Sequence, residues 1–196
     1  MDDSLRPKVI AIAGPNGAGK STLAPFLIRD TYGLMEYVNA DSIALGLSAF
    51  DPESVAFESG RIMLKRLHAL ARQRSNFAFE TTLSSRSYAY RVAALQQQGY
   101  EFDLIYLWLS SPELAVHRVR ERVRMGGHNI PEEVIRRRYV KSVRNFFDLY
   151  QPLADSWGIY DNSEVSAPSQ IATANKGGHI QVLDESLWQK FCEVAG

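Results

Sequence analysis

The residues with the clearest chemical signature lie between positions 14 and 22, where the sequence reads GPNGAGKST. Glycines in such a loop let successive backbone N–H groups turn towards one anion. A lysine at its end can reach the β- and γ-phosphates of a nucleotide, and the following hydroxyl can bind Mg²⁺. The spacing therefore predicts a phosphate-binding loop with Ser21 as metal ligand, formed by Gly14, Pro15, Asn16, Gly17, Ala18, Gly19, Lys20, Ser21 and Thr22.

Two carboxylates follow later apolar runs, where they could act on a phosphate bound by this loop. Asp41 ends YVNAD, and Glu80 ends FAFE. In an open parallel sheet, ligands bind outside the carboxyl ends of the strands. Phosphoryl transfer to a hydroxyl needs a carboxylate that accepts the proton, so Asp41 is the predicted base. The alternative is that Asp41 is the N-cap of the helix that follows.

Glu80 and the hydroxyl residues after it form a second predicted group. Glu80 is predicted to hold the magnesium shell or, together with Thr82, to position the acceptor. Ser84 and Ser85 offer further hydroxyls in the same segment. The alternative for Glu80 is a structural role as the cap of a helix that begins near these serines.

A basic region at about residues 112–150 is predicted to form a helical lid. The stretch RVRERVRMGGHNIPEEVIRRRY places a glycine break between two helical segments that are both rich in arginine. Arginines on a closing lid neutralise charge on the transferred phosphoryl group and exclude water. Arg118 and Arg122 are the predicted catalytic arginines, and His128 is predicted to contact phosphate or substrate. The alternative is a solvated surface with ordinary ion pairs.

The elements that must position these residues alternate along the chain, which predicts parallel strands joined by helices. A nucleotide base could lie where the last parallel strand ends, near residues 160–163. The predicted strands are 9–13, 37–40, 77–79, 102–109 and 158–160, and the predicted helices are 20–30, 52–74, 85–98, 112–125, 131–150 and 185–194. A small hairpin is predicted within residues 171–184.

Length and composition are typical of one globular domain over residues 1–196. The chain has 22 basic and 22 acidic residues, so no overall charge attracts nucleic acid or membrane. Cys192 is the single cysteine, which excludes an internal disulfide. The sequence shows no apolar run of about 20 residues and no leader pattern. We therefore expect a cytoplasmic protein that binds neither membrane nor nucleic acid.

Other classes of phosphate-binding protein fit the sequence less well. A guanine-reading N-K-x-D motif is missing, because Asn175-Lys176 is followed by two glycines. The longest apolar strand, FDLIYLWLSS, ends in serines instead of the acidic residues typical of motor ATPases. A polynucleotide kinase would need a basic surface beyond the lid. The remaining classes are a small-molecule kinase and a nucleotide-binding regulatory module with little turnover.

The chain resembles the zeta toxin family of P-loop kinases, in particular its short, single-domain bacterial members. The resemblance rests on the combination of GPNGAGKST, NADSIA, FETTLSS, the lid and YDNS. The resemblance covers residues 8 to about 165. It implies a three-layer α/β P-loop nucleotide-kinase-like fold with a five-stranded parallel sheet in the order 2-3-1-4-5. It also implies ATP or GTP with Mg²⁺, transfer to the 3′-hydroxyl of UDP-N-acetylglucosamine, and a small antitoxin protein that blocks the nucleotide site.

Carried onto this sequence, the resemblance assigns roles to individual residues. It makes Lys20 the phosphate-binding lysine, Asp41 the catalytic aspartate and Glu80 the substrate-binding glutamate. Arg118 or, in the other register, Arg122 matches the first lid arginine. The chain departs from the toxins at Ser84, where they carry an arginine, and at the second lid arginine, where His128 or Arg137 would have to serve. We therefore expect transfer of the γ-phosphoryl group of ATP to a small-molecule hydroxyl, with another metabolite or an antibiotic as the alternative acceptor.

Overall fold

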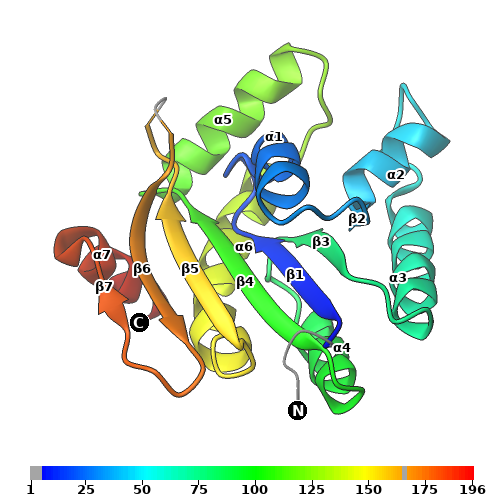
Figure 1. The fold of residues 1–196 in the computed structure, drawn as a ribbon. Coiled ribbons are helices and arrows are strands. Elements are labelled where there is room, and N and C mark those ends of the chain that lie inside the picture. The colour runs from blue at the N-terminus through cyan, green and yellow to red at the C-terminus, as the bar shows by residue number, and fades with distance from the viewer. Residues whose placement is uncertain (1–5, 165–166) are drawn as a thin grey trace.

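The computed structural model describes residues 6–164 and 167–196, which build one seven-stranded sheet in the order β2-β3-β1-β4-β5-β6-β7 (Figure 1). Neighbouring strands from β2 to β5 are parallel, whereas β6 pairs antiparallel with both β5 and β7. The strands are β1 (Lys8–Ala13), β2 (Tyr37–Val38), β3 (Phe77–Thr81), β4 (Glu101–Trp108), β5 (Ser156–Asp161), β6 (Ser169–Asn175) and β7 (Gln181–Val182).

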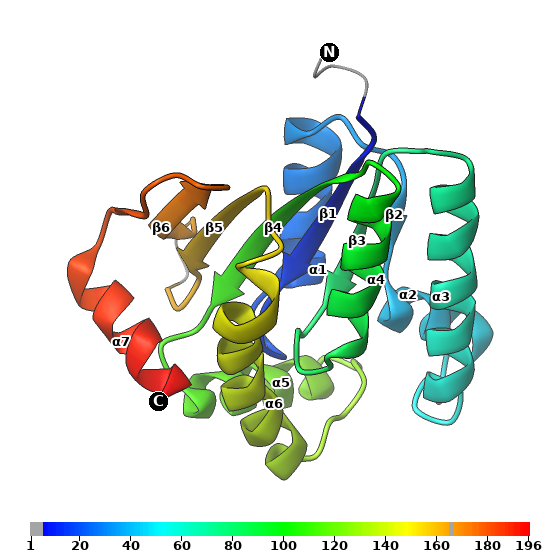
Figure 2. The ribbon, with the colours of Figure 1, turned by 90° about the horizontal axis from the view of Figure 1, so that it is seen from below.

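Helices connect the parallel strands and cover both faces of the sheet. They are α1 (Lys20–Ala24), the π-helix η2 (Pro25–Thr31), α2 (Ala40–Leu47), α3 (Ala56–Arg72), α4 (Ser87–Gln97), α5 (Pro112–Arg124), α6 (Glu132–Asn145), the π-helix η3 (Phe146–Tyr150) and α7 (Glu185–Ala195). Figure 2 shows the first helical segment on one face of the sheet and α4 and α6 on the other. The sheet is thus the middle of three layers, as a P-loop nucleotide-kinase-like fold requires.

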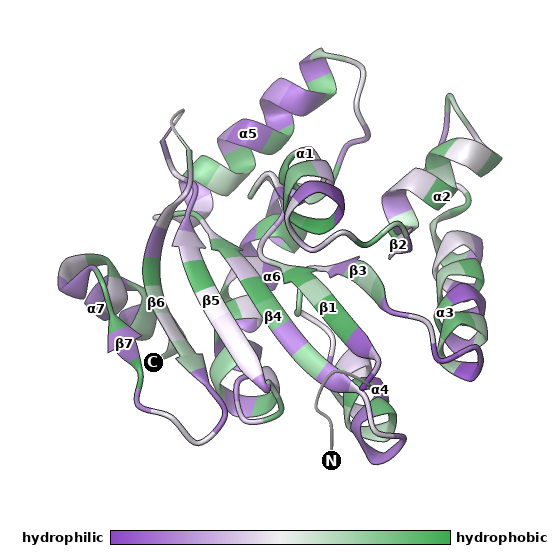
Figure 3. Ribbon diagram, viewed as in Figure 1, coloured by the Kyte–Doolittle hydropathy of each residue, from purple (hydrophilic) through white to green (hydrophobic). Residues whose placement is uncertain are grey.

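The core lies along the central strands. Every residue from Val9 to Ala13 is fully buried, and β4 is buried from Phe102 to Trp108. Figure 3 shows β1 mostly green and α5 mostly purple, as expected for a central strand and a surface helix. Within the described ranges, no helix has the length and apolar character needed to cross a membrane.

An aromatic cluster fixes the end of the chain against the sheet. Tyr106 of β4 meets the rings of Phe146 and Phe191 with centroids 5.4 Å away in both cases, each in an edge-to-face arrangement. Trp157 of β5 packs on Phe146 at 5.5 Å. Because such pairs combine burial with a favourable ring geometry, they hold η3 and α7 to the sheet.

The structure confirms the predicted strand order and extends it. The predicted hairpin is part of the same sheet, since β6 and β7 continue it beyond β5. The helix predicted from position 52 begins only at Ala56, because residues 52–55 form a turn in which the Asp51 carboxylate accepts the Ser54 N–H. The helix predicted over 20–30 changes to a π-helix at Pro25, a residue that has no N–H to donate.

Candidate active site

The phosphate-binding loop connects β1 to α1 in a conformation that glycine alone tolerates at two points. Gly14 has φ +137°, and a Cβ there would lie 2.0 Å from the carbonyl oxygen of Leu107. Gly19 has φ +81° and is the N-cap of α1. A Cβ at Gly19 would meet the amide nitrogen of Asn162 at 2.6 Å. The loop is therefore held tightly against β4 and the end of β5, where glycine avoids a clash at both points.

Lys20 is buried at the first position of α1, where its side chain is 6% exposed. Its Nζ donates to the Pro15 carbonyl at 2.9 Å and lies 3.8 Å from Oε1 of Glu80. Burial lowers the pKa of this ammonium group, while the nearby charges of Glu80 and Asp41 oppose that shift. The charge is thus held against the loop, between the Pro15 carbonyl and the Glu80 carboxylate.

Glu80, at the end of β3, is the hub of a hydrogen-bond network. Its Oε2 accepts the Tyr37 hydroxyl at 2.6 Å, the Ser21 hydroxyl at 2.8 Å and Nδ2 of Asn39 at 2.8 Å. Burial and the charge of Glu80 both raise the pKa of Tyr37, which keeps its hydroxyl protonated and donating. Glu80 therefore organises the phosphate loop and does not cap α4, whose N-cap Arg86 has no side-chain hydrogen bond.

Asn39, between β2 and α2, decides the role open to Asp41. Its Oδ1 accepts the backbone N–H groups of Asp41 at 2.7 Å and Ser42 at 3.4 Å, so Asn39 is the N-cap of α2. The alternative reading of Asp41 as the cap is therefore wrong. The Asp41 carboxylate is left to face the cavity described next.

A cavity of about 540 Å³ brings most of the predicted site residues together. The loop residues Asn16, Gly17 and Gly19 form one end of its lining. Lys20, Ser21, Thr22, Asp41, Glu80, Thr82, Arg118, Arg122 and His128 also line it. The cavity thus joins the carboxyl ends of β1, β2 and β3 to the two helices of the predicted lid.

The two predicted lid arginines of α5 make different contacts. Arg118 donates to the carbonyl oxygens of Asn162 at 2.6 Å and Ser163 at 2.8 Å, which ties α5 to the loop after β5. Arg122 donates to the carbonyl of His128 at 2.9 Å, while its buried Nε has no partner among the described residues. Because a buried donor without an acceptor is costly, the Arg122 Nε is suited to a ligand oxygen.

Of the three arginines at 136–138, Arg138 lines the cavity, whereas Arg137 is exposed and does not. Arg136 is paired with Glu113 and Glu132 on the outer surface. Arg138 makes no hydrogen bond or ion pair with any described residue, and burial lowers its pKa while Asp41 opposes the shift. Its half-buried charge is thus available to an anionic ligand, a role that the sequence assigned to His128 or Arg137.

Sequence reasoning missed Tyr37 and Asn39, and it did not single out Arg138 among the arginines of the predicted lid. Arg138 carried a signal, because it lies three residues after the buried Ile135 and one before the buried Tyr139, on the inward stripe of α6. Asn39 lies just before a helical pattern, at a position typical of an N-cap. Tyr37 carried no such signal, since its contact with Glu80 joins residues 43 positions apart.

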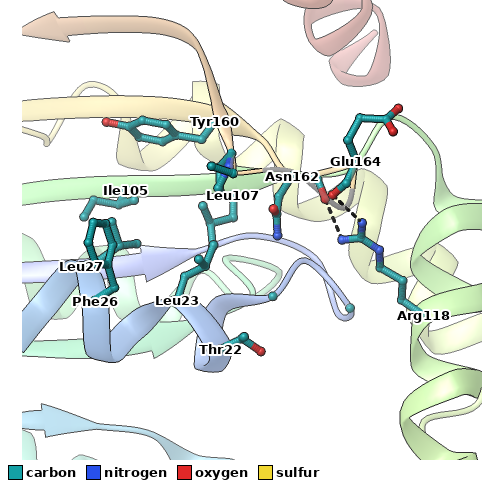
Figure 4. A pocket seen from close by; sticks show the side chains of 14 residues that line it. Thr22, Leu23, Phe26, Leu27, Ile105, Leu107, Arg118, Tyr160, Asn162 and Glu164 are labelled. Carbon is teal, nitrogen blue, oxygen red and sulfur yellow. Dashed lines mark hydrogen bonds between the residues drawn. The ribbon is translucent and has the colours of Figure 1, made fainter.

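A second cavity, of about 710 Å³, opens on the other side of the phosphate loop (Figure 4). Leu23 of α1, Leu27 of η2 and Leu107 of β4 contribute apolar side chains to it, and the Tyr160 ring lies along β5. Asn162 stands where this cavity meets the loop and donates to the Ala18 carbonyl at 2.9 Å. The cavity is therefore an apolar slot beside a phosphate-binding loop, which is where the predicted base position near residues 160–163 falls.

The residues beside the loop also fit Mg²⁺. Ser21 Oγ and Glu80 Oε2 lie 2.8 Å apart and are both hard oxygen donors, which Mg²⁺ prefers alongside water and phosphate oxygens. In the part of the chain that the structure describes, no group of three or more His, Cys, Asp or Glu side chains could hold a metal ion. The donor set therefore suits a metal that arrives with a nucleotide.

Comparison with known protein families shows the family of the chain. A model of the AAA_33 family, described as an AAA domain, matches residues 9–141, which include the phosphate loop, both carboxylates and most of the lid. The chain belongs to this family. A related protein of Haemophilus influenzae, itself uncharacterised, is 30% identical over 135 residues, which are 69% of this chain and 94% of the relative.

Solved structures share the fold over almost the whole chain. A chain of the AvrRxo1-ORF1:AvrRxo1-ORF2 complex with sulphate ions has a TM-score of 0.77 at 18% identity, and the match covers 96% of this chain but 64% of that one. The PezAT toxin–antitoxin structure of Streptococcus pneumoniae has a TM-score of 0.64 at 18% identity, covering 97% and 86%. These likenesses establish an α/β P-loop nucleotide-kinase-like fold.

Proposed function

We propose that this protein transfers the γ-phosphoryl group of ATP, with Mg²⁺, to a hydroxyl of a small molecule, as zeta toxins do. One observation carries the proposal: a single cavity is lined by the phosphate-loop lysine Lys20, the carboxylate of Asp41 and the cations Arg122 and Arg138. Phosphoryl transfer needs groups that bind the phosphates, a proton acceptor, and positive charges near the transferred group.

The proposed roles follow from the contacts already described. The loop amides and Lys20 hold the β- and γ-phosphates, and the base lies in the apolar slot beside Leu23 and Tyr160. Ser21 and Glu80 would hold Mg²⁺, which supplies positive charge between the β- and γ-oxygens. Asp41 accepts the proton of the acceptor hydroxyl. Thr82 positions the acceptor, as argued in the next subsection.

The cations of the lid are proposed to act on the transferred group. Arg122 and Arg138 bind the oxygens of the γ-phosphoryl group as charge develops on them, and His128 stands beside Arg122 at the hinge. Arg118 closes the slot over the base by its bonds to the loop after β5. Because α5 and α6 both contribute, closing the lid would bring the charges together and exclude water.

Two proteins of similar fold support the proposed kinase activity and a protein partner. A putative kinase from Chloroflexus aurantiacus has a TM-score of 0.53 with this chain at 16% identity, over 66% of this chain and 75% of that one. The likeness to a structure from a toxin–antitoxin system supports a small antitoxin protein as a partner that would cover the nucleotide site. A nucleotide-binding module with little turnover is the second candidate, which the following experiment separates.

The test is the substitution Asp41→Asn, which keeps the size of the side chain and removes the proton acceptor. We expect phosphoryl transfer from labelled ATP to fall by about a hundredfold or more, with ATP affinity within about twofold of the original protein. Asp148→Asn changes an exposed aspartate outside the cavity and is the matched control. Unchanged transfer in Asp41→Asn would refute the base assignment, and no transfer by the unaltered protein to any hydroxyl compound would favour the binding module.

A further inference from the structure

The loop after β3, residues 82–85, is fixed in an unusual conformation beside the proposed reaction centre. Leu83 has φ +54°, a left-handed conformation that is uncommon for a residue with a side chain, and it is fully buried. The Leu83 N–H donates to Oγ1 of Thr81 at 3.1 Å. Strain of this kind persists only where the surroundings enforce it, and it clusters at functional sites.

Two side chains from the far end of the lid enforce that conformation. Nδ2 of Asn145, the last residue of α6, donates to the Leu83 carbonyl at 2.6 Å. The hydroxyl of Tyr150, the last residue of η3, donates to the Ser85 carbonyl at 2.7 Å. The loop backbone is therefore held at both carbonyls, which leaves its side chains to serve the cavity.

The loop turns hydroxyl groups towards the cavity. Thr82, Ser84 and Ser85 all line it. Oγ1 of Thr82 and Oγ of Ser84 lie 2.8 Å apart, so they form a hydroxyl pair that can both donate and accept. Such a pair matches neighbouring hydroxyls on a ligand.

The wall next to this pair is apolar and rigid. Met63 of α3 and Tyr88 of α4 line the cavity there, and the Tyr88 hydroxyl donates to the Met63 sulfur at 3.3 Å. The Tyr88 ring is stacked on Phe79, with centroids 5.4 Å apart and planes 19° apart. Phe79 supports the Tyr88 ring from behind, so Tyr88 and the Met63 thioether present a fixed apolar surface, against which the C–H groups of a ring can pack.

Charge divides the cavity into two parts. The cations among its lining residues, Lys20, Arg118, Arg122 and Arg138, come from the phosphate loop and the lid. The part formed by residues 82–85, Met63 and Tyr88 contributes hydroxyl and apolar groups, and the cavity also contains the carboxylates of Asp41 and Glu80. Lys20 lies 3.8 Å from Glu80, and Asp41 is an electrostatic neighbour of Arg138, so these carboxylates are countered by cations that we assign to ATP and to the transferred group. Among the described residues, the part formed by the hydroxyl pair, Met63 and Tyr88 has no cation of its own to bind a phosphate carried by the acceptor.

We propose that the acceptor is an uncharged, polyhydroxylated ring of the sugar class, bound by the Thr82–Ser84 hydroxyl pair and packed on Tyr88. The inference rests on the proposed kinase function. In the reaction, a ring hydroxyl oxygen forms the new bond to the γ-phosphorus, the bond from that phosphorus to the β,γ-bridging oxygen breaks, ADP leaves, and the hydroxyl proton passes to the Asp41 carboxylate.

The first experiment compares matched acceptors with labelled ATP and the full chain. The pairs are N-acetylglucosamine with UDP-N-acetylglucosamine, glucose with glucose 6-phosphate, and inositol with an inositol phosphate. We expect kcat/KM to be at least about tenfold higher for the neutral member of an accepted pair. A preference for the charged member overturns the inference but leaves the kinase function standing. No product from any pair, by a protein that transfers phosphate to another class of hydroxyl compound, overturns the inference alone. No transfer to any hydroxyl compound overturns the kinase function as well.

The second experiment changes the loop itself. Thr82→Val removes one hydroxyl at nearly constant shape and is expected to raise the acceptor KM about tenfold while the ATP KM stays unchanged. Thr173→Val, which removes a hydroxyl bonded to the Trp157 carbonyl in the sheet, is the control. Ser84→Arg adds a cation and is expected to shift selectivity about tenfold towards the phosphorylated member. An unchanged acceptor KM in Thr82→Val would show that the loop does not bind the acceptor.

Discussion

At the scale of single residues, the position of Arg138 on its helix separates it from its two arginine neighbours. Arg136 is neutralised by two glutamates, and Arg137 is exposed to solvent. Arg138 is half-buried with Asp41 as an electrostatic neighbour and has no ion pair among the described residues. A guanidinium held partly away from water, without a fixed partner, interacts strongly with an anion that enters the cavity.

The substitution Arg138→Ala tests this difference. We expect kcat to fall by about a hundredfold, because the charge acts on the transferred group, while the ATP KM changes little. Arg137→Ala on the same helix is the control and should leave kcat within about twofold. Steady-state rates with any accepted hydroxyl compound measure both. Equal losses in the two variants would mean that the arginines act through general surface charge.

The sequence predicted the residues whose roles depend on local spacing. The glycines, Lys20 and Ser21 follow one another in a fixed pattern, so their arrangement around an anion could be predicted without the rest of the fold. The network around Glu80 could not, because Tyr37 and Asn39 reach it only when β2 pairs with β3. Tertiary contacts of this kind leave no periodic trace in the chain.

At the scale of elements, α6 and η3 connect the two parts of the proposed site. The middle of α6 carries Arg138, and its end carries Asn145, which holds the strained loop at Leu83. A movement of this helix would therefore act on the phosphate end and the acceptor end together. The sequence predicted the helix and its glycine hinge but not this coupling. The left-handed conformation occurs at a leucine, a residue type that does not predict it.

Asp155, just before β5, shows how one carboxylate joins several elements. It accepts the Phe102 N–H at 2.9 Å, Nε2 of Gln96 at 3.0 Å and Nζ of Lys176 at 3.1 Å. Burial alone would raise its pKa, but these donors outweigh burial and lower it. β4, α4 and the turn after β6 are thus tied at one point.

A lowered pKa makes this tie sensitive to acid. The ionised carboxylate stabilises the fold above the pKa of an unfolded aspartate, about 3.9, and this contribution is lost as pH falls through the lower folded value. We expect Asp155→Asn to reduce the free energy of unfolding by roughly 1 to 3 kcal/mol at pH 7 and by less at pH 3. Urea titrations at several pH values, with Asp148→Asn as control, measure this. A loss that grew towards acid pH would contradict the assignment.

At the scale of the whole molecule, the phosphate loop lies between two cavities of about 540 and 710 Å³. One is polar and charged, and the other is largely apolar, so a single loop can hold a molecule with both kinds of surface. A nucleotide has this character, with charged phosphates at one end and a flat base at the other. Binding across the loop would connect α1, β4 and the lid through one ligand.

Such a ligand should stabilise the folded chain measurably. At a hundred times its dissociation constant, ATP with Mg²⁺ adds about 2.7 kcal/mol, which for a chain of this size raises Tm by about 5 to 10 °C. Lys20→Met should abolish the shift, because Lys20 supplies the buried charge under the loop. Lys141→Met, at an exposed position of α6, should retain it. A full shift in Lys20→Met would refute the loop as the nucleotide site.

The two outermost strands of the sheet, β2 and β7, are each two residues long. A long, flat strand at either margin would offer a row of unpaired N–H and C=O groups on which another molecule could add its own strand. Because both outermost strands of the seven-stranded sheet are so short, the sheet exposes few unpaired N–H and C=O groups for such pairing. The fold can therefore keep a wide, strongly apolar sheet at high concentration without joining copies edge to edge into fibrils.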